Sequence, residues 1–114
     1  MYNISVIVPF YKGNKYLTGL KQSLENACIS YEGKVEVVMV NDSPKEKIDK
    51  KLIQSEKYSL VIVEHDMNYG IHKARVTGIG KAKGEYVLLL DQDDKIKSEF
   101  FKEMSATLDN NKSI

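Results

Sequence analysis

The chain has 114 residues, of which 42% are hydrophobic and 29% are charged, so it suffices for one compact globular domain. Its basic and acidic side chains nearly cancel to a net charge of +1, which gives no electrostatic argument for nucleic acid as a partner. The single cysteine, Cys28, excludes an internal disulfide bond and favours a reducing compartment, and we expect it to be a small buried side chain.

No apolar run approaches the length of a membrane-spanning helix, and the chain opens on a strand pattern rather than a secretion signal. These two features predict a cytoplasmic protein.

Short apolar runs alternate with segments of helical periodicity along the chain. We predict strands at residues 4–8, 35–40, 60–63 and 86–90. Helices are expected at residues 15–28, from Ser43 past Leu52, from Ile71 to Gly84, and after Ser98. Pro9 is expected to close the first strand and Asn14 to cap the first helix. Residues 109–114 are expected to fray.

The segment after the second strand has the features of a helix start. Ser43-Pro44-Lys45-Glu46 offers a cap, a proline at the first helical position and a glutamate three residues after the cap. In the next predicted helix the inner face carries Ala74 and Gly78, and such small residues let a helix approach a sheet closely.

Strict alternation of strands and helices predicts an α/β fold of Rossmann-like type, with a mainly parallel sheet and helices on both faces. The commonest strand order for such a chain is 3-2-1-4, with a switch point between strands one and four. That order would place residues 9–11, Asp42 and residues 91–94 around one crevice.

The most informative stretch is the acidic run Asp91-Gln92-Asp93-Asp94, which directly follows the buried strand from Tyr86 to Leu90. Two like charges about 4 Å apart repel by roughly 4 kcal/mol at an effective dielectric of 20, so clustered acids need a compensating partner. A divalent cation is one such partner, and hard carboxylate oxygens without cysteine ligands suit Mg²⁺ or Mn²⁺. A polar turn is the competing interpretation.

The remaining polar residues narrow the choice of ligand. Neither glycine-rich phosphate loop, G-x-G-x-x-G or G-x-x-x-x-G-K-[ST], occurs after the first strand, so a bound phosphate would have to be neutralised by a cation and side chains. Arg75, the only arginine, suits a diphosphate or a base edge, or else is an exposed helix charge. His65 and His72 lack metal-ligand spacing and are interpreted as surface side chains or as supports for site residues.

Four stretches together resemble the family 2 glycosyltransferases, which have the GT-A fold. They are Ser5-Val6-Ile7-Val8-Pro9-Phe10-Tyr11, Val38-Met39-Val40-Asn41-Asp42-Ser43, Asn68-Tyr69-Gly70-Ile71-His72-Lys73-Ala74-Arg75 and Gly84-Glu85-Tyr86-Val87-Leu88-Leu89-Leu90-Asp91-Gln92-Asp93-Asp94. The resemblance implies a metal-dependent, inverting enzyme that transfers a sugar from a UDP-sugar to a glycan, lipid-linked or other hydroxyl acceptor, with Mn²⁺ or Mg²⁺ as cofactor.

The resemblance also implies roles for single residues. Asp42 would accept a hydrogen bond from the uracil ring, and Asn68 with Arg75 would hold the base and diphosphate side. Asp91 would lie near the ribose or sugar, and Asp93 would ligate the metal, with Asp91 and Asp94 as further candidate ligands. The full set of implied nucleotide-binding residues is Pro9, Phe10, Tyr11, Asp42, Asn68, Gly70, Arg75, Asp91 and Gln92.

By the same resemblance, residues 1–114 correspond to the nucleotide-sugar-binding part of a GT-A domain, and the acceptor part with its general base would lie beyond Ile114. We therefore expect the chain to bind donor without transferring sugar efficiently, and the parent protein to lie peripherally at the inner face of a membrane. The strand at residues 86–90 would then present an open edge, which predicts self-association. A non-catalytic nucleotide-binding or interaction module and a sugar-phosphate nucleotidyltransferase remain as alternatives.

Overall fold

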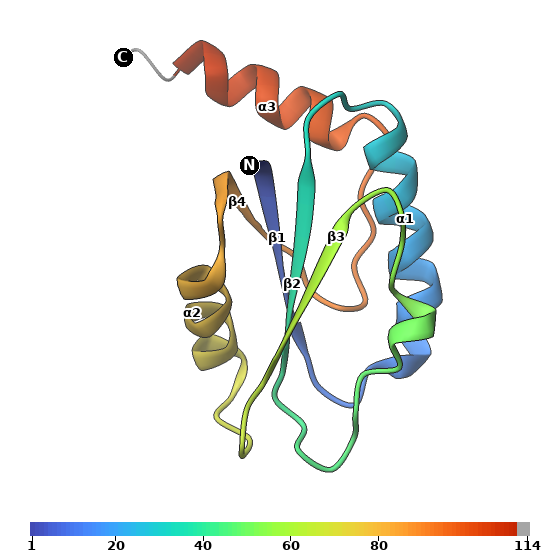
Figure 1. The fold of residues 1–114 in the computed structure, drawn as a ribbon, viewed down its shortest axis with the longest axis vertical. Coiled ribbons are helices and arrows are strands. Elements are labelled where there is room, and N and C mark those ends of the chain that lie inside the picture. The colour runs from blue at the N-terminus through green and yellow to red at the C-terminus, as the bar shows by residue number, and fades with distance from the viewer. Residues whose placement is uncertain (112–114) are drawn as a thin grey trace.

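The structure is a computed structural model that describes residues 1–111. Its centre is a four-stranded parallel sheet of order β3-β2-β1-β4 (Figure 1). The strands are β1 (Tyr2–Phe10), β2 (Val35–Asn41), β3 (Ser59–Glu64) and β4 (Gly84–Leu89). The predicted strand order and parallel arrangement are confirmed.

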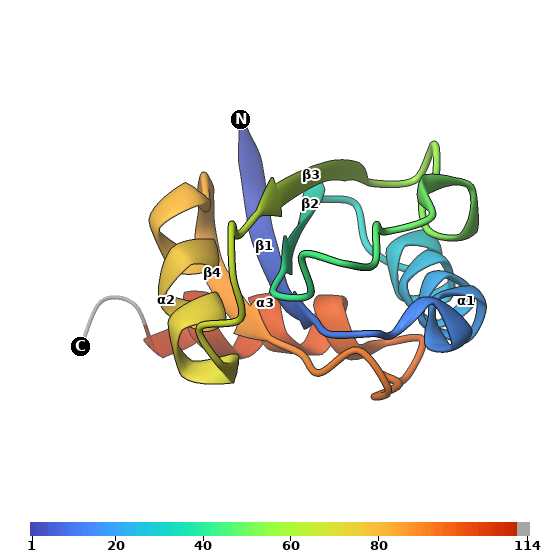
Figure 2. The same ribbon diagram turned by 90° about the horizontal axis from the view of Figure 1, so that it is seen from below.

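Three helices cover the two faces of this sheet. They are α1 (Leu17–Ile29), α2 (Ile71–Lys81) and α3 (Phe100–Asn111), with short 3₁₀ helices η1 (Asn14–Tyr16) and η2 (Lys50–Leu52). α1 and α3 lie on one face and α2 on the other, as the view from below shows (Figure 2). β1 and β2 are central and covered on both sides, which explains why their sequences are nearly continuous apolar runs.

Alternate residues of β1 point into the two layers. Val6 and Val8 pack in the larger core beneath α1 and α3, whereas Ile7 packs under α2 with Ala74. Gly78 of α2 lies so close to the sheet that a Cβ there would be 2.3 Å from Ile7 Cγ2. The small inner face of this helix therefore sets how near α2 comes to β1.

The predicted helix after β2 is wrong, since only the three-residue η2 forms in that region. The capping groups are bound elsewhere. Ser43 Oγ accepts from Lys12 N–H at 3.3 Å and donates to Asn41 Oδ1 at 2.7 Å, and Glu46 Oε2 accepts from Asn14 Nδ2 at 3.2 Å. Because both ends of the capping box have tertiary partners, neither satisfies a helix terminus. The segment instead packs Ile48 and Ile53 into the core as an irregular chain.

Two boundary predictions at β1 also fail. The strand continues through Pro9 to Phe10, because pairing with β4 ends at Ile7–Leu89 and the missing Pro9 N–H interrupts no bond to that strand. Asn14 does not cap α1; its side chain bonds Lys47 O and Asp49 N, which joins the loops after β1 and β2. α3 is helical through Asn111, so fraying from Asp109 is not seen, and residues 112–114 lie outside the described residues.

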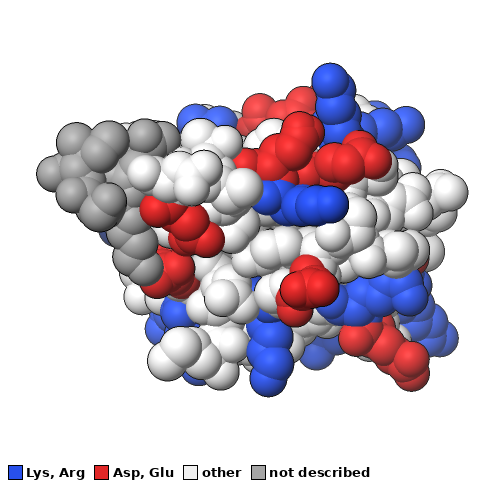
Figure 3. Space-filling model, turned by 90° about the horizontal axis from the view of Figure 1, so that it is seen from above, with Lys and Arg blue, Asp and Glu red and all other residues white. Residues whose placement is uncertain are grey.

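Cys28 is buried as expected, and burial raises the pKa of its thiol to about 11, so the thiol stays protonated at neutral pH. On the face at the amino ends of the strands, lysine and acidic side chains are interspersed (Figure 3). Within residues 1–111, no helix combines the length and the apolar character that crossing a bilayer requires.

Candidate functional site

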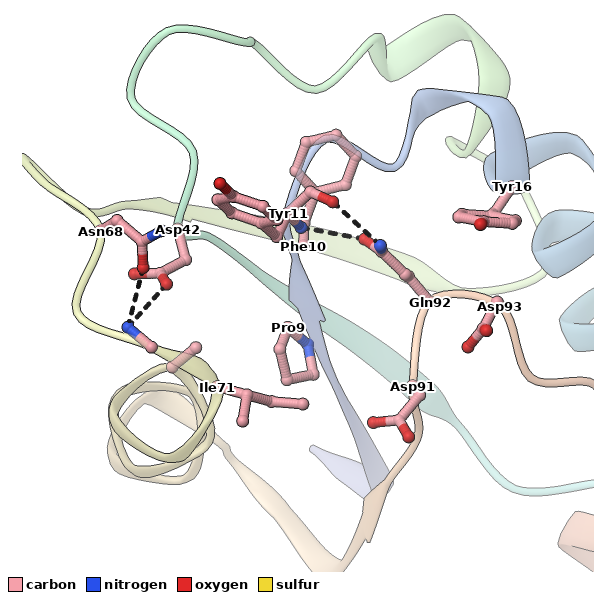
Figure 4. A pocket seen from close by; sticks show the side chains of 12 residues that line it. Pro9, Phe10, Tyr11, Tyr16, Asp42, Asn68, Ile71, Asp91, Gln92 and Asp93 are labelled. Carbon is pink, nitrogen blue, oxygen red and sulfur yellow. Dashed lines mark hydrogen bonds between the residues drawn. The ribbon is translucent and has the colours of Figure 1, made fainter.

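A pocket of about 440 Å³ opens at the carboxyl ends of the strands, where ligands bind in open α/β sheets (Figure 4). Asp42 and Asn68 lie on one side of it, and Asp91 and Asp93 on the other. The lining residues are Pro9, Phe10, Tyr11, Tyr16, Asp42, Asn68, Gly70, Ile71, Ala74, Asp91, Gln92 and Asp93. Segments that follow all four strands therefore meet in one cavity, although they are up to about 80 residues apart in the sequence.

Asp42 is the most constrained carboxylate of the pocket. Its Oδ1 accepts from Tyr69 N–H at 2.9 Å and contacts His65 Nδ1 at 2.8 Å, and its Oδ2 accepts from Gly70 N–H at 2.8 Å. Burial acts to raise the pKa of Asp42, but hydrogen bonds from His65, Tyr69 and Gly70 outweigh it, and the pKa lies below the ordinary aspartate value. The ionised carboxylate thus holds the amino end of α2, where a negative charge is favourable.

His65 supports this carboxylate from behind. Its Nε2 lies 2.9 Å from Thr77 Oγ1 of α2, and its ring meets that of Tyr69 edge-on at a centroid distance of 5.2 Å. Sequence reasoning placed His65 among surface or supporting side chains, and the structure shows the supporting role. His72 is exposed on α2 and does not line the pocket.

The turn that starts α2 depends on Gly70. Its φ of +96° and ψ of +165° lie in a region that L-residues rarely adopt, and its N–H points to Asp42. Asn68 Oδ1 accepts from the same N–H at 3.1 Å. The Asn68-Tyr69-Gly70 turn is therefore shaped by two side-chain acceptors and one glycine.

The loop after β1 is tied to the acidic run after β4. Gln92 Oε1 accepts from Tyr11 N–H at 2.9 Å, and Gln92 Nε2 donates to Tyr11 O at 3.0 Å. The side-chain amide thus pairs with the Tyr11 peptide groups as a neighbouring strand would. This contact fixes the position of Tyr11 relative to the acidic run that contains Asp91 and Asp93.

The acids of the run separate in space. Asp91 Oδ1 accepts from Arg75 Nη2 at 3.0 Å. Asp93 lines the pocket and has no hydrogen-bond or ion-pair partner within residues 1–111, whereas Asp94 faces an adjoining hollow with Lys15 and Lys95. Nowhere in the described part of the chain do three or more acids, histidines or cysteines converge as a ready metal cage.

This donor set fits a hard cation that takes one or two carboxylates and completes its shell with ligand phosphates and water, as Mg²⁺ does. Asp93 offers free oxygens at the pocket, and Asp91 is close in the same loop.

Nine of the nucleotide-site or metal residues predicted from the sequence line the pocket: Pro9, Phe10, Tyr11, Asp42, Asn68, Gly70, Asp91, Gln92 and Asp93. Arg75 reaches it only through its bond to Asp91, and Asp94 lies outside it. Tyr16, Ile71 and Ala74 were missed. Tyr16 precedes the first buried leucine of α1 and Ile71 is the first residue of α2, so helical periodicity marks both as helix starts without marking them as site residues.

The sequence matches the family described as Glycosyl transferase family 2 over residues 5–114. A minor teichoic acid biosynthesis protein of Bacillus subtilis, GgaB, is 31% identical over 98% of this chain, which covers 13% of that protein. The poly(ribitol-phosphate) beta-N-acetylglucosaminyltransferase TarS of Staphylococcus aureus is 36% identical over 99% of this chain, which covers 20% of it. The chain thus spans a minor part of each of these relatives.

The fold also matches solved structures of TarS. The crystal structure of its residues 1–349 in complex with UDP superposes with a TM-score of 0.79 at 32% identity, over 95% of this chain and 32% of that one. The complex of the same TarS fragment with UDP-GlcNAc gives a TM-score of 0.76 at 34% identity, over 95% of this chain and 31% of that one. Sequence and fold agree that the chain belongs to glycosyl transferase family 2.

Proposed function

We propose that residues 1–114 form the donor half of a glycosyltransferase, which binds a UDP-sugar in the pocket at the carboxyl ends of the strands. The observation that carries this is the convergence of four strand-following segments on one cavity of about 440 Å³, large enough for a nucleotide-sized ligand. Family membership and the TarS complexes with UDP and UDP-GlcNAc support the choice of ligand.

The residue roles follow the chemistry of each side of the pocket. Tyr11 and Pro9 supply apolar surface for the base, and Asp42 and Asn68 supply oxygen acceptors on the side where its single N–H group can donate. Asp42 Oδ2 already accepts from Gly70, but a carboxylate oxygen can accept more than one hydrogen bond. Arg75, next to Asp91, supplies positive charge on the phosphate side.

We further propose that Asp93, with Asp91 nearby, holds a Mn²⁺ or Mg²⁺ ion together with the donor diphosphate. Such a cation would stabilise the negative charge that develops on the departing UDP. The chain's own contribution is the carboxylate of Asp93, which lines the pocket and is unpaired within residues 1–111, so that its binding to a metal breaks no ion pair in that part of the chain.

The acceptor and the stereochemistry of transfer depend on the whole protein and not on the donor half alone. GgaB is a minor teichoic acid biosynthesis protein and TarS is a poly(ribitol-phosphate) beta-N-acetylglucosaminyltransferase, which supports a polymer of this kind as acceptor. The family resemblance supports inversion at the anomeric carbon, with a general base from another part of the protein. The donor half alone is expected to bind UDP-sugar and to transfer sugar poorly.

Calorimetric titration with UDP, with and without Mn²⁺, tests this function. We expect binding that Mn²⁺ strengthens and that Asp93→Ala weakens, because the cation loses its free carboxylate. Glu32→Ala removes an exposed acid elsewhere and is the matched control. Preference for UTP over UDP would favour a nucleotidyltransferase, and absence of nucleotide binding would favour an interaction module.

A further inference from the structure

Gln92 lies between Asp91 and Asp93 in the acidic run after β4. Both polar atoms of its side chain bond the backbone of Tyr11, at 2.9 Å to the N–H and 3.0 Å to the carbonyl oxygen (Figure 4). Within residues 1–111 the Gln92 side chain makes no hydrogen bonds other than these two. Only a primary amide presents one acceptor and one donor in this geometry, so the contact is specific for Gln or Asn chemistry.

The segment that Gln92 grips has an unusual backbone. Lys12 has a φ of +47°, the only positive value outside glycine within the described residues, and its N–H donates to Ser43 Oγ at 3.3 Å. A Cβ on Gly13 would lie 2.1 Å from Gln92 Oε1, so this position admits no side chain while Gln92 stays in place. Such a left-handed residue persists only where its surroundings hold it.

We propose that Gln92 is a positioning residue, which acts through Tyr11 rather than by touching the nucleotide. Its amide fastens the Tyr11-Lys12-Gly13 turn and thereby sets the wall of the donor pocket that Tyr11 forms. We call the pair of hydrogen bonds between Gln92 and Tyr11 the clamp. This inference rests on the proposed function for the identity of the ligand, but the clamp is a property of the free protein and is tested without ligand.

The ligand-free test is hydrogen exchange at the Tyr11 amide. In Gln92→Ala the amide loses its acceptor, so we expect exchange to be at least about tenfold faster than in the unmodified protein. Gln22→Ala makes the same chemical change on an exposed part of α1 and should leave this amide unchanged. Equal exchange in all three proteins would overturn the clamp, whether or not UDP binds.

Gln92→Glu keeps a side chain of the same length but removes its N–H donor, so it separates the effect of the amide from the effect of losing a side chain. An ionised glutamate still accepts from Tyr11 N–H but cannot donate to Tyr11 O, and its charge faces that carbonyl oxygen. We therefore expect UDP to bind this variant about tenfold more weakly at pH 7. Affinity equal to that of the unmodified protein would count against the amide geometry.

A double-mutant cycle with Gly13 completes the test. In Gly13→Ala the added methyl group displaces Gln92, so UDP affinity should fall about as much as in Gln92→Ala. The two losses should not add in the double variant, because both remove one contact. If the unmodified protein binds UDP and Gln92→Ala binds it equally well, the positioning role is refuted; if the unmodified protein does not bind UDP, the proposed function fails while hydrogen exchange still decides the clamp.

Discussion

The ring of His65, at the end of β3, lies 2.8 Å from the carboxylate of Asp42, at the end of β2, and this bond is backed by Thr77 of α2. Together with the Tyr69 and Gly70 amides, it makes Asp42 the point where two strand ends and the start of a helix meet. A residue of this kind contributes to stability and to the shape of the pocket at the same time.

Replacement of Asp42 by alanine should lower the free energy of unfolding by about 1–3 kcal/mol, since two backbone N–H groups and His65 lose a partly buried acceptor. Urea denaturation at pH 7 measures the change. Asp66→Ala is the matched control, because that carboxylate is exposed and, among the described residues, accepts only from Tyr69 Oη. A loss below 0.5 kcal/mol, within the range typical of surface substitutions, would contradict the assigned role.

The pH dependence has a definite sign. Because the pKa of Asp42 is lower in the folded protein than the unfolded value of about 3.9, the unfolded state binds its proton more readily. The resulting stabilisation is complete at pH values above the unfolded pKa and is lost as pH falls through the folded pKa. The stability difference between the unmodified protein and Asp42→Asn should thus shrink as the pH falls below about 4. Urea titrations between about pH 5 and pH 3 measure this difference, and a difference that grows toward low pH over this range would contradict the prediction.

Two glycines of α2 offer a paired test of helix–sheet packing. Gly78→Ala places a methyl group 2.3 Å from Ile7 Cγ2, whereas the Cβ of Gly80→Ala meets no atom within 4 Å. We expect the first change to destabilise the protein by about 1–2 kcal/mol and the second to be neutral or to stabilise it by up to about 1 kcal/mol. Thermal unfolding of both variants is the measurement, and similar shifts would show that α2 is free to move away from β1.

Arg75→Lys should weaken UDP binding while leaving the stability of the fold nearly unchanged. The ion pair with Asp91 is formed by side chains that are 36% and 43% exposed, so its loss should change stability by less than about 0.5 kcal/mol. Arg75 Nε is shielded from solvent and has no partner in the described part of the chain, and lysine cannot replace its planar fork. UDP affinity should fall by about tenfold, and uridine affinity by less, if Arg75 serves the diphosphate. Equal losses for both ligands would place Arg75 at the base instead.

The edge strand β4 should mediate self-association at high concentration. In the part of the chain that the structure describes, β4 pairs only with β1, and Val87 and Leu89 are 40% and 45% exposed on it. Charged residues on an edge strand oppose pairing, so Val87→Lys should reduce the mass found by light scattering. Ile29→Lys, at a 69% exposed position on α1, is the control and should leave the mass unchanged. A monomer at millimolar concentration would refute this prediction.

The failed helix and cap predictions share one cause. Ser43 and Glu46 have the spacing of a capping box, and Asn14 is a suitable cap, but all three side chains bond to other loops at this end of the sheet. Local propensity amounts to about 1 kcal/mol per cap, which a few tertiary hydrogen bonds can outweigh. Tyr16 lies in the first turn of the helix predicted at residues 15–28, and Ile71 starts the helix predicted after the third strand, but their place in the pocket depends on where the other loops end.

By itself, the sequence determined the alternation of buried strands and helices and the four motif stretches that mark the family, because burial periodicity and motifs are local properties. The strand order was predicted as the commonest one for such an alternation, and the structure has that order. Only the tertiary structure decided which polar groups form hydrogen bonds with distant parts of the chain. Asp42 is held by His65, 23 residues away, and Gln92 by Tyr11, 81 residues away. Such partners leave no pattern in the chain, because their distance in sequence is set by the order of the strands and their pairing arises only when the carboxyl ends of those strands are brought together.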